Sequence, residues 1–367
     1  MEKIKLAFIC SNLGQGGAER QLVNLISQID KEKFEVTVFL YAVQIDPFYL
    51  NSLNKCDIKL ELNLLKHNFF IFKIIEALRK INFFLKENYY DIIITTLFMN
   101  NLFVRLIAPP LYKNKIVTNM RTSILNYSFL YKFAEIYLIR KSYIVFNSQK
   151  SLEGFKLMLR EKFHWRLSLI YNGYYIPLEP DFQIRQKKAF GCLGRLNKEK
   201  NIIQVVEVFQ ETKGIRSKSN LIVQGHFGDQ YNDIANLLSS DKIEIREKDK
   251  NIDLFFDSID VLILPSIFEG CPNVLFEALL RKKLCIVSSG ANSDNFITNG
   301  VNGFVYDGSN KELEEVMKRA LQILEQEEKL IIENGYSYAK KNFSMKVMVN
   351  KYEELFRDIY EKNKSSN

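Results

Sequence analysis

The sequence predicts an α/β fold with two domains, each built around a parallel sheet. In both halves of the chain, apolar strand-like runs alternate with helix-like segments, which is typical of βαβ units. Residues 177–188, PLEPDFQIRQKK, hold two prolines and little apolar periodicity, so they are predicted to be a linker. A chain of 367 residues is long enough for one domain on each side of it.

The first half opens with a βαβ unit around a glycine-containing loop. A strand at 4–10 is followed by SNLGQGGAER, then by helical spacing at 18–29 and a strand at 35–41. The loop lacks GxGxxG followed by an acid, so a dinucleotide cofactor fits it poorly. Gly16 and Gly17 would let a phosphate or sugar approach the backbone, and a plain tight turn is the alternative.

The same alternation continues to the end of the chain. Apolar runs predict the strands, and apolar residues at helical spacing predict the helices. We expect strands at 92–94, 116–119, 143–147, 221–223, 242–246, 261–264 and 284–288, a short strand around Leu193, and helices at 69–86, 201–210, 252–256, 311–333 and 345–361.

The most informative stretch is residues 265–281, PSIFEGCPNVLFEALLR, directly after a predicted buried strand. Pro272 suits the first position of a helix, where a missing N–H does no harm. Asn273, Val274 and Leu275 would form the first helical turn, whose N–H groups have no partner inside the helix. Such a helix start attracts anions, and phosphate in particular.

Two carboxylates stand on either side of this predicted phosphate site. Glu269 precedes the helix, Glu277 lies inside it, and Gly270 lets a ligand come close to the backbone. Carboxylates repel phosphate but accept hydrogen bonds from hydroxyls. The arrangement therefore suits a nucleotide sugar, which has sugar hydroxyls on both sides of a phosphate group. An ordinary strand, loop and helix with surface glutamates is the alternative.

Composition limits the class of protein. Hydrophobic residues make up 47% and charged residues 26%, the balance of a globular chain. We expect no signal peptide, and no apolar run reaches the roughly 20 residues of a membrane span. The five cysteines are scattered without a CxxC pair, so they are predicted to be reduced thiols of a cytoplasmic protein.

Positive charge is concentrated in the first half. The net charge is +8, and residues 1–180 carry 24 Lys and Arg against 15 Asp and Glu. We therefore expect this half to face phospholipid, nucleic acid or a phosphorylated acceptor, with a lysine-rich surface lacking any partner as the alternative. Aromatic and basic residues mix at 69–86 and 124–141. This mixture favours a face for peripheral membrane contact or, equally, a core face with solvated lysines.

Five short motifs follow one another along the chain: GGAER at 16–20, YNG at 171–173, GRLNKEKN at 194–201, FEGCPNVLFEAL at 268–279 and GVNGFV at 300–305. The fourth is close to the pattern EGxPxxxxEA. In this order and at these intervals, the motifs resemble those of the retaining glycosyltransferases of family 4, also called group 1 glycosyl transferases. The resemblance spans nearly the whole chain.

The resemblance implies the GT-B fold, in which two Rossmann-like parallel-sheet domains face a central cleft. Residues 1–180 would form the acceptor-binding domain, and residues 181–344 would form the nucleotide-sugar-binding domain. The last helix, at about 345–367, would cross back to pack on the first domain.

The resemblance also implies roles for residues of the second domain. Glu277 matches the residue that binds the ribose hydroxyls, and Glu269 matches the one that contacts the transferred sugar. The amides of 273–275 would hold the diphosphate. Arg195 and Lys200 match the basic pair that neutralises the charge growing on the leaving nucleotide diphosphate, where stabilisation lowers a barrier most. A surface salt-bridge pair is the alternative for these two.

Other features of the family bear on cofactors and stereochemistry. Gly16 and Gly17 would line the cleft near the acceptor and the distal phosphate, and Gly270 would approach the donor. The chain contains no DxD sequence, so no divalent metal and no cofactor beyond the donor is expected. Retention would follow from attack on the front face of the sugar, with the leaving phosphate oxygen taking the acceptor proton.

The chain departs from the family at three positions. Arg121 stands where many relatives have a histidine near the reacting sugar, so we expect it to contact the donor phosphate or a phosphorylated acceptor. Thr96 or Met99 stands at a second such position, and Asn295 replaces a frequent acidic residue. The histidines are predicted to be structural: His67, His164 and His226.

The leading hypothesis is a cytoplasmic hexosyl- or N-acetylhexosaminyltransferase, metal-independent and peripheral to the membrane. It would use a nucleotide sugar, most simply a UDP-sugar, to extend a lipid-linked or polysaccharide acceptor in capsule or lipopolysaccharide biosynthesis. One alternative is a nucleotide-sugar epimerase of the same fold, for which few acid and base residues are present. The other is a non-catalytic scaffold that binds membrane or nucleic acid, against which the intact motif residues argue.

Overall fold

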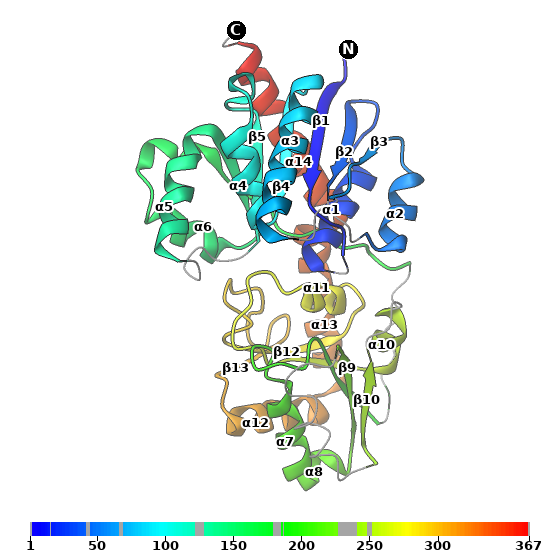
Figure 1. Cartoon of the computed structure of the whole chain (residues 1–367). Coiled ribbons are helices and arrows are strands. Elements are labelled where there is room, and N and C mark those ends of the chain that lie inside the picture. Colours follow the sequence, from blue (N-terminus) through cyan, green and yellow to red (C-terminus); the bar gives the residue numbers. More distant parts are fainter. Residues whose placement is uncertain are drawn as a thin grey trace. The chain divides into compact units, whose positions relative to one another are not determined.

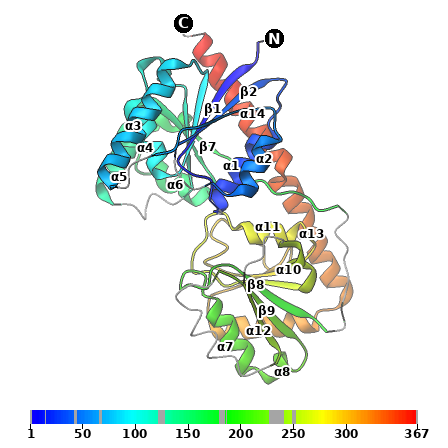
Figure 2. The same ribbon diagram turned by 45° about the vertical axis from the view of Figure 1, so that its right-hand side comes forward.

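The computed structural model divides the chain into two compact units. Unit 1 comprises Met1–Gly173 and Met345–Asn367, and unit 2 comprises Tyr174–Ser344 (Figures 1 and 2). Each unit has its own parallel sheet and hydrophobic core, as the alternation of strands and helices predicts. The residues that the structure describes are 2–14, 16–41, 45–65, 69–121, 128–178, 185, 187–226, 241–247 and 252–365.

Unit 1 contains a seven-stranded sheet in the order β3-β2-β1-β4-β5-β6-β7, and every pairing is parallel. Its central strands are buried on both faces, which is why β1 is mostly apolar and why β4 and β5 begin with apolar residues, although both have polar residues near their ends. The strands are β1 Ile4–Cys10, β2 Phe34–Leu40, β3 Lys59–Leu62, β4 Ile92–Thr96, β5 Ile116–Met120, β6 Ser142–Phe146 and β7 Leu167–Leu169.

Helices cover both faces of this sheet. One core joins β1, β2 and β4 to α1 and α14, and it includes Leu22, Met348 and Phe356. The core on the opposite face includes Ile81 and Phe84 of α3 and Val104 of α4. The helices are α1 Gly17–Gln28, α2 Pro47–Asn54, α3 Phe70–Glu87, α4 Phe98–Ile107, η1 Pro110–Tyr112, α5 Phe129–Leu138, η3 Ile139–Lys141, α6 Gln149–Lys156, η4 Glu161–Arg166 and α14 Met345–Lys364.

The C-terminal helix α14 belongs to unit 1, as the resemblance to the GT-B fold implies. It contacts α1 and β4 and buries six of its apolar side chains there (Figure 1). These side chains belong to Met345, Met348, Val349, Tyr352, Phe356 and Ile359.

Unit 2 contains a six-stranded parallel sheet in the order β10-β9-β8-β11-β12-β13. The strands are β8 Ala189–Leu193, β9 Asn220–Gly225, β10 Ile243–Glu247, β11 Val261–Leu264, β12 Leu284–Ser288 and β13 Phe304–Tyr306. The helices are α7 Ile202–Glu211, α8 Lys213–Arg216, α10 Ile252–Ser258, α11 Asn273–Leu279, α12 Asn310–Gln322 and α13 Glu325–Phe343.

One predicted helix is wrong. Residues 311–333 lie in two helices, α12 and α13, because the backbone is extended at Ile323 (ψ 137°) and Leu324 (ψ 142°). Neither residue is glycine or proline, so the usual signal for a helix end is missing. Three glutamates in the first turn of α13 are the one sequence feature that favours a new helix start.

Two other predictions fall partly outside the described residues. The linker at 177–188 and the aromatic segment at 124–141 each contain residues that the structure does not describe. The described part of the second segment forms α5 and η3. Among the described helices, none is both long enough and apolar enough to cross a bilayer.

The strand order reverses at one place in each sheet. In unit 1, β1 pairs with both β2 and β4, and in unit 2, β8 pairs with both β9 and β11. Loops that leave neighbouring strands at such a place turn in opposite directions and leave room for a ligand at the carboxyl ends of the strands. These two strand ends are therefore the places where a binding site is expected.

Candidate functional site

In unit 2, the loop that follows β8 lies directly against the end of β9. A Cβ atom on Gly225 would lie 1.6 Å from the carbonyl oxygen of Gly194, so only glycine fits at position 225. On the other side, the N–H of Ile267 donates to the carbonyl oxygen of Glu199 at 2.9 Å. These contacts hold the GRLNKEKN loop against the segment that follows β11.

This packing brings Lys200 and Glu269 together. The Lys200 ammonium donates a hydrogen bond to Glu269 Oε1, and the buried hydroxyl of Ser266 donates to the same oxygen at 2.8 Å. The side chains of Lys200 and Glu269 are 26% and 14% exposed. The ion pair is therefore partly shielded, and its geometry is fixed by a third group rather than left to two mobile surface chains.

Arg195 lies on the same loop as Lys200 but differs from it in exposure and in hydrogen bonding. It is exposed, and within the part of the chain that the structure describes, its guanidinium has no hydrogen-bond or ion-pair partner. The alternative of a salt-bridge pair made by both residues is thus wrong for Arg195. Lys200 does make a salt bridge, but with Glu269, which is itself a predicted site residue.

Helix α11 starts one residue later than the sequence predicts. Pro272 is the N-cap with an extended ψ of 103°, and Asn273 is the first helical residue. The N–H of Leu275 donates to the carbonyl oxygen of Pro272 at 3.1 Å, so the expectation that it lacks a partner is wrong. The side chain of Asn273 accepts a hydrogen bond from the hydroxyl of Tyr174 at 2.7 Å. Val274 and Gly270 are half-buried beside this helix start.

Glu277 is not a surface glutamate. It lies inside α11 with 7% of its surface exposed. The rings next to it fix the helix, since Phe276 stacks on Tyr174 and on Phe343 with centroid distances of 5.4 and 3.9 Å. The carboxylate is therefore held in one place on a rigid support, a condition for precise recognition of hydroxyl groups.

In unit 1, a carboxylate covers the start of α1. Gly16 is the N-cap, and a Cβ atom there would lie 2.1 Å from Glu19 Oε2. Gly16 and Gly17 are both exposed. The negative charge of Glu19 at the positive end of α1 stabilises the helix and competes with any phosphate at this point. The glycines thus give the Glu19 side chain room to fold back.

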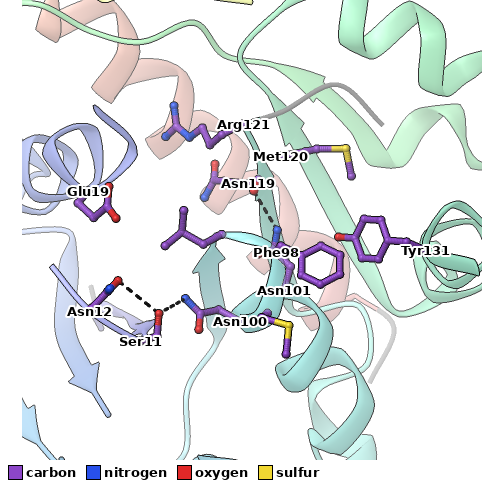
Figure 3. A pocket seen from close by; sticks show the side chains of 12 residues that line it. Ser11, Asn12, Glu19, Phe98, Asn100, Asn101, Asn119, Met120, Arg121 and Tyr131 are labelled. Atoms are coloured by element: carbon purple, nitrogen blue, oxygen red, sulfur yellow. Dashed lines mark hydrogen bonds between the residues drawn. The ribbon is translucent and has the colours of Figure 1, made fainter. Parts of the chain in front are cut away.

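A pocket of about 370 Å³ opens at the carboxyl ends of β1, β4 and β5 (Figure 3). Its position is the strand reversal of unit 1, where a ligand is expected. Its wall combines apolar side chains with polar ones and carries one charge of each sign, from Glu19 and Arg121. It is lined by Ser11, Asn12, Glu19, Leu97, Phe98, Met99, Asn100, Asn101, Asn119, Met120, Arg121 and Tyr131.

Three asparagines form the floor of this pocket, and sequence reasoning missed them. Asn100 accepts from the hydroxyl of Tyr41 and donates to the carbonyl oxygen of Thr96 at 2.7 Å. Asn101 donates to the carbonyl oxygen of Asn119 at 2.9 Å. The signal was the pair of adjacent asparagines in α4, shortly after the end of β4, since buried amides need several fixed partners.

Asn119 is tied to the C-terminal helix. Its side-chain oxygen accepts from the hydroxyl of Tyr352 on α14, and its NH₂ donates to the carbonyl oxygen of Thr95 at 3.1 Å. Burial raises the pKa of Tyr352, so the hydroxyl keeps its proton and remains a donor. The pocket floor therefore depends on residues from both ends of the chain.

Arg121 points from the end of β5 toward the pocket (Figure 3). One of its terminal nitrogens donates to Asn172 Oδ1, in the YNG motif. Its Nε is buried, and among the described residues it has no hydrogen-bond partner. Leu97, on the opposite wall, has φ 70° and ψ 148°, a conformation that costs a non-glycine residue about 1–3 kcal/mol and is concentrated at functional sites.

The other residues named from the sequence are Thr96, Met99 and the three histidines. Thr96 is buried at the end of β4, and Met99 lines the pocket. His164 contacts the carbonyl oxygen of Leu159, and the carbonyl oxygen of His226 accepts from the N–H of Leu196 at 3.0 Å. His67 lies outside the described residues.

The structure of loop 292–302 explains the GVNGFV motif without a ligand. The side chain of Asn302 accepts from the N–H of Thr298 at 2.7 Å, and Gly300 has φ 76°. Asn295 also has a positive φ, of 55°. This motif therefore stabilises a turn.

Comparison with known proteins supports a single assignment. Residues 179–338 match the family model described as glycosyl transferases group 1. A Campylobacter jejuni enzyme is 26% identical over 296 residues, which cover 78% of this chain and 79% of that protein. It is a GalNAc-alpha-(1->4)-GalNAc-alpha-(1->3)-diNAcBac-PP-undecaprenol alpha-1,4-N-acetyl-D-galactosaminyltransferase.

Solved structures resemble the whole chain. HepE of Anabaena, in complex with UDP and glucose, matches with a TM-score of 0.78 and 17% identity, over 97% of this chain and 100% of that one. A glycosyltransferase of Rickettsia africae matches with a TM-score of 0.78 and 18% identity, over 98% and 99%. Residues 179–338 therefore resemble the group 1 glycosyl transferases, and the chain has the GT-B fold of two parallel-sheet α/β domains.

Proposed function

We propose that this protein is a retaining glycosyltransferase of family 4 that takes a hexose or N-acetylhexosamine from a UDP-sugar. The observation that carries the proposal is the group at the strand reversal of unit 2, where Lys200, Glu269 and Ser266 form one network beside the exposed Arg195. Two cations next to a fixed carboxylate suit a ligand that combines a diphosphate with sugar hydroxyls.

In the proposed reaction, the bond between the sugar C1 and the β-phosphate oxygen breaks while the acceptor hydroxyl forms a bond to C1 on the same face. The acceptor proton passes to the leaving phosphate oxygen. Arg195 and Lys200 would stabilise the charge that grows on the UDP, which is the change that distinguishes the transition state. Glu277 would bind the ribose hydroxyls, and the amides of Asn273 and Val274 would bind the diphosphate.

For the acceptor, we propose a lipid-linked oligosaccharide in surface glycan biosynthesis. The C. jejuni relative, whose name specifies an undecaprenol-diphosphate-linked substrate, supports this choice. The pocket of unit 1 supports it as well, because its amide and hydroxyl groups match the hydroxyl and acetamido groups of a sugar. Arg121, which lines the pocket and has a buried Nε without a partner among the described residues, would bind an acidic group of the acceptor or the donor phosphate.

We further propose that the reaction needs no divalent metal and takes place in the cytoplasm. The two cations of unit 2 supply the positive charge that a metal would otherwise bring. All five cysteines are free thiols, and burial raises the pKa of Cys10, Cys192 and Cys285. Stable unpaired thiols are typical of reducing compartments.

The test is a transfer assay with the full-length protein, a panel of UDP-sugars, and an undecaprenyl-diphosphate-linked oligosaccharide. We expect one UDP-sugar to be consumed, with the α-linkage of the donor kept in the product by NMR, and with activity unchanged by EDTA. Glu277→Ala should abolish transfer, whereas Glu315→Ala, an exposed change on α12, should not. A protein that binds no nucleotide sugar at all would refute the proposal.

A further inference from the structure

A buried ion pair joins helices α4 and α5 of unit 1. The guanidinium of Arg105 donates to both carboxylate oxygens of Glu135, at 2.7 Å from Nη1 to Oε2. The two side chains are 0% and 1% exposed, so water does not reach them. Burying two charges costs free energy, and the proposed reaction uses neither residue. The pair therefore has a role other than direct contact with a substrate.

The carboxylate occupies the middle of the buried side of α5. Among the described side chains of this helix, the buried ones are Tyr131, Glu135 and Leu138, which follow one another at helical spacing. An apolar residue is usual at such a central position, and exchanging a buried ion pair for apolar residues of similar volume is often neutral or stabilising. Stability alone does not explain the pair, whereas its fixed bidentate geometry does.

Each partner stands one helical turn after a residue that lines the pocket of unit 1. Arg105 follows Asn101 by four residues on α4, and Glu135 follows Tyr131 by four on α5, so each two share a helix face. The rings of Phe98 and Tyr131, both in the pocket wall, have centroids 3.8 Å apart (Figure 3). The ion pair and this ring contact thus join the two helices at two levels and fix the two walls relative to each other.

Arg105 is also bonded to the floor of the pocket. Its Nε donates to the backbone carbonyl oxygen of Asn101 at 2.7 Å. The side chain of Asn101 accepts from the hydroxyl of Thr95 at 2.7 Å and donates to the carbonyl oxygen of Asn119 at 2.9 Å. The guanidinium therefore connects α5 to the hydrogen bonds that hold the asparagine floor.

We propose that Arg105 and Glu135 are positioning residues that set the width of the unit 1 pocket and thereby its affinity for the acceptor sugar. The inference rests on the proposed function, because it takes this pocket to be the acceptor site. Neither residue is part of the described lining, so Arg105 acts through Asn101 and Glu135 acts through Tyr131. A wall displaced by about 1 Å misplaces the bound sugar, an error that can cost on the order of 10²-fold in rate.

The experiment replaces both charges together, because removing one would leave the other buried and unpaired. Arg105→Met/Glu135→Leu should leave the melting temperature of the full-length protein within about 4 °C of the wild-type value. In the transfer assay with the undecaprenyl-diphosphate-linked oligosaccharide, the acceptor KM should rise about tenfold while the donor KM stays unchanged.

The matched control is a buried ion pair of unit 2, between Lys188 and Glu328, whose side chains are 10% and 5% exposed. Lys188 directly precedes β8, whereas the proposed donor site lies at the carboxyl ends of the strands. Lys188→Met/Glu328→Leu makes the same chemical change and should leave the acceptor KM unchanged. An equal rise in both double variants would show a general effect of stability and would overturn the inference.

Arg105→Lys tests the geometry without removing the charge, and it remains informative if the double variant does not fold. The lysine keeps a positive charge beside Glu135 but lacks the planar fork and the Nε that donates to Asn101. The acceptor KM should therefore rise about threefold. An acceptor KM that stays at the wild-type value in every folded variant would contradict the positioning role.

Hydrogen exchange of the free protein tests the inference without any acceptor. Amides of residues 98–107 and 129–138 should exchange faster in Arg105→Met/Glu135→Leu than in the wild type, and at the wild-type rate in the control variant. Unchanged exchange in both helices would overturn the inference even if no sugar is transferred. UDP-sugar binding, measured by melting shift, tests the proposed function separately.

Discussion

The two strand reversals of this chain have different chemistry. In unit 2, the strand ends carry fixed charges, with Lys200 bonded to Glu269 and Arg195 exposed beside them. In unit 1, the pocket at the strand ends is lined mainly by neutral side chains, including Asn100 and Asn101 of α4, beside one charge of each sign from Glu19 and Arg121. A diphosphate leaving group needs cations whichever sugar the donor carries. An acceptor sugar is neutral and is recognised by hydrogen bonds, whose arrangement can differ from one acceptor to another. This difference agrees with the family match, which covers residues 179–338 and leaves unit 1 out.

The largest effect should follow from removing Lys200, one of the two cations at the site of unit 2. Lys200→Met should lower kcat by about 10²–10³, the loss typical of one group that stabilises transition-state charge. Steady-state kinetics with the donor and acceptor measures it. Lys198→Met, an exposed change in the same loop, should have no such effect. Equal kcat values for the two variants would show that the charge in unit 2 is not catalytic.

The backbone packing beneath that loop should matter next. Gly225→Ala would press a Cβ atom onto the carbonyl oxygen of Gly194 and should lower the free energy of unfolding by about 1–3 kcal/mol. Urea denaturation measures this change. Gly214→Ala, whose Cβ meets nothing within 4 Å, should change stability by less than about 1 kcal/mol. A stable Gly225→Ala protein with normal kinetics would mean that the loop tolerates displacement.

In unit 1, the cation that lines the pocket, Arg121, should act on the acceptor and not on the donor. Arg121→Gln should raise the acceptor KM about tenfold, which corresponds to about 1.4 kcal/mol, and leave the donor KM unchanged. Arg160→Gln, an exposed arginine of the same unit, is the matched control. If the donor KM rose instead, Arg121 would bind the donor phosphate. The assignment of the donor to unit 2 and of the acceptor to unit 1 would then be wrong.

The smallest effect distinguishes two buried tyrosine hydroxyls. Tyr352 donates to Asn119 in unit 1, and Tyr306 donates to Gln204 in unit 2 at 3.0 Å. Each change to phenylalanine should cost about 1 kcal/mol of unfolding free energy in thermal or urea denaturation. Only Tyr352→Phe should also raise the acceptor KM, because Asn119 lines the pocket. The same kinetic change in both variants would point to a general loss of stability.

Much of the fold could be predicted from the sequence, because parallel strands buried on both faces are apolar runs of recognisable length. The short edge strands β3 and β7 could not, since they are only partly buried and carry mixed residues, and β13 could not because its apolar run has only three residues. The break between α12 and α13 at Ile323 was missed because the chain turns there without glycine or proline.

The sites divide in a similar way. Glu269, Glu277, Arg195 and Lys200 were predicted as site residues through their motifs. The contact between Lys200 and Glu269 could not be predicted, because a close approach of two loops brings them together. The asparagines of unit 1 lay next to a segment already singled out at Thr96. Their role depends on Tyr41 and on the distant α14, which no local pattern reveals.

Helix α14 sets the order in which the protein can mature on the ribosome. Unit 2 is one uninterrupted segment, whereas the core of unit 1 needs Met348, Tyr352 and Phe356, which are synthesised last. Domains made first normally fold first. Here unit 1 cannot complete its core until α14 has left the exit tunnel, and part of its apolar surface stays uncovered until then. Unit 2 can therefore complete its fold earlier.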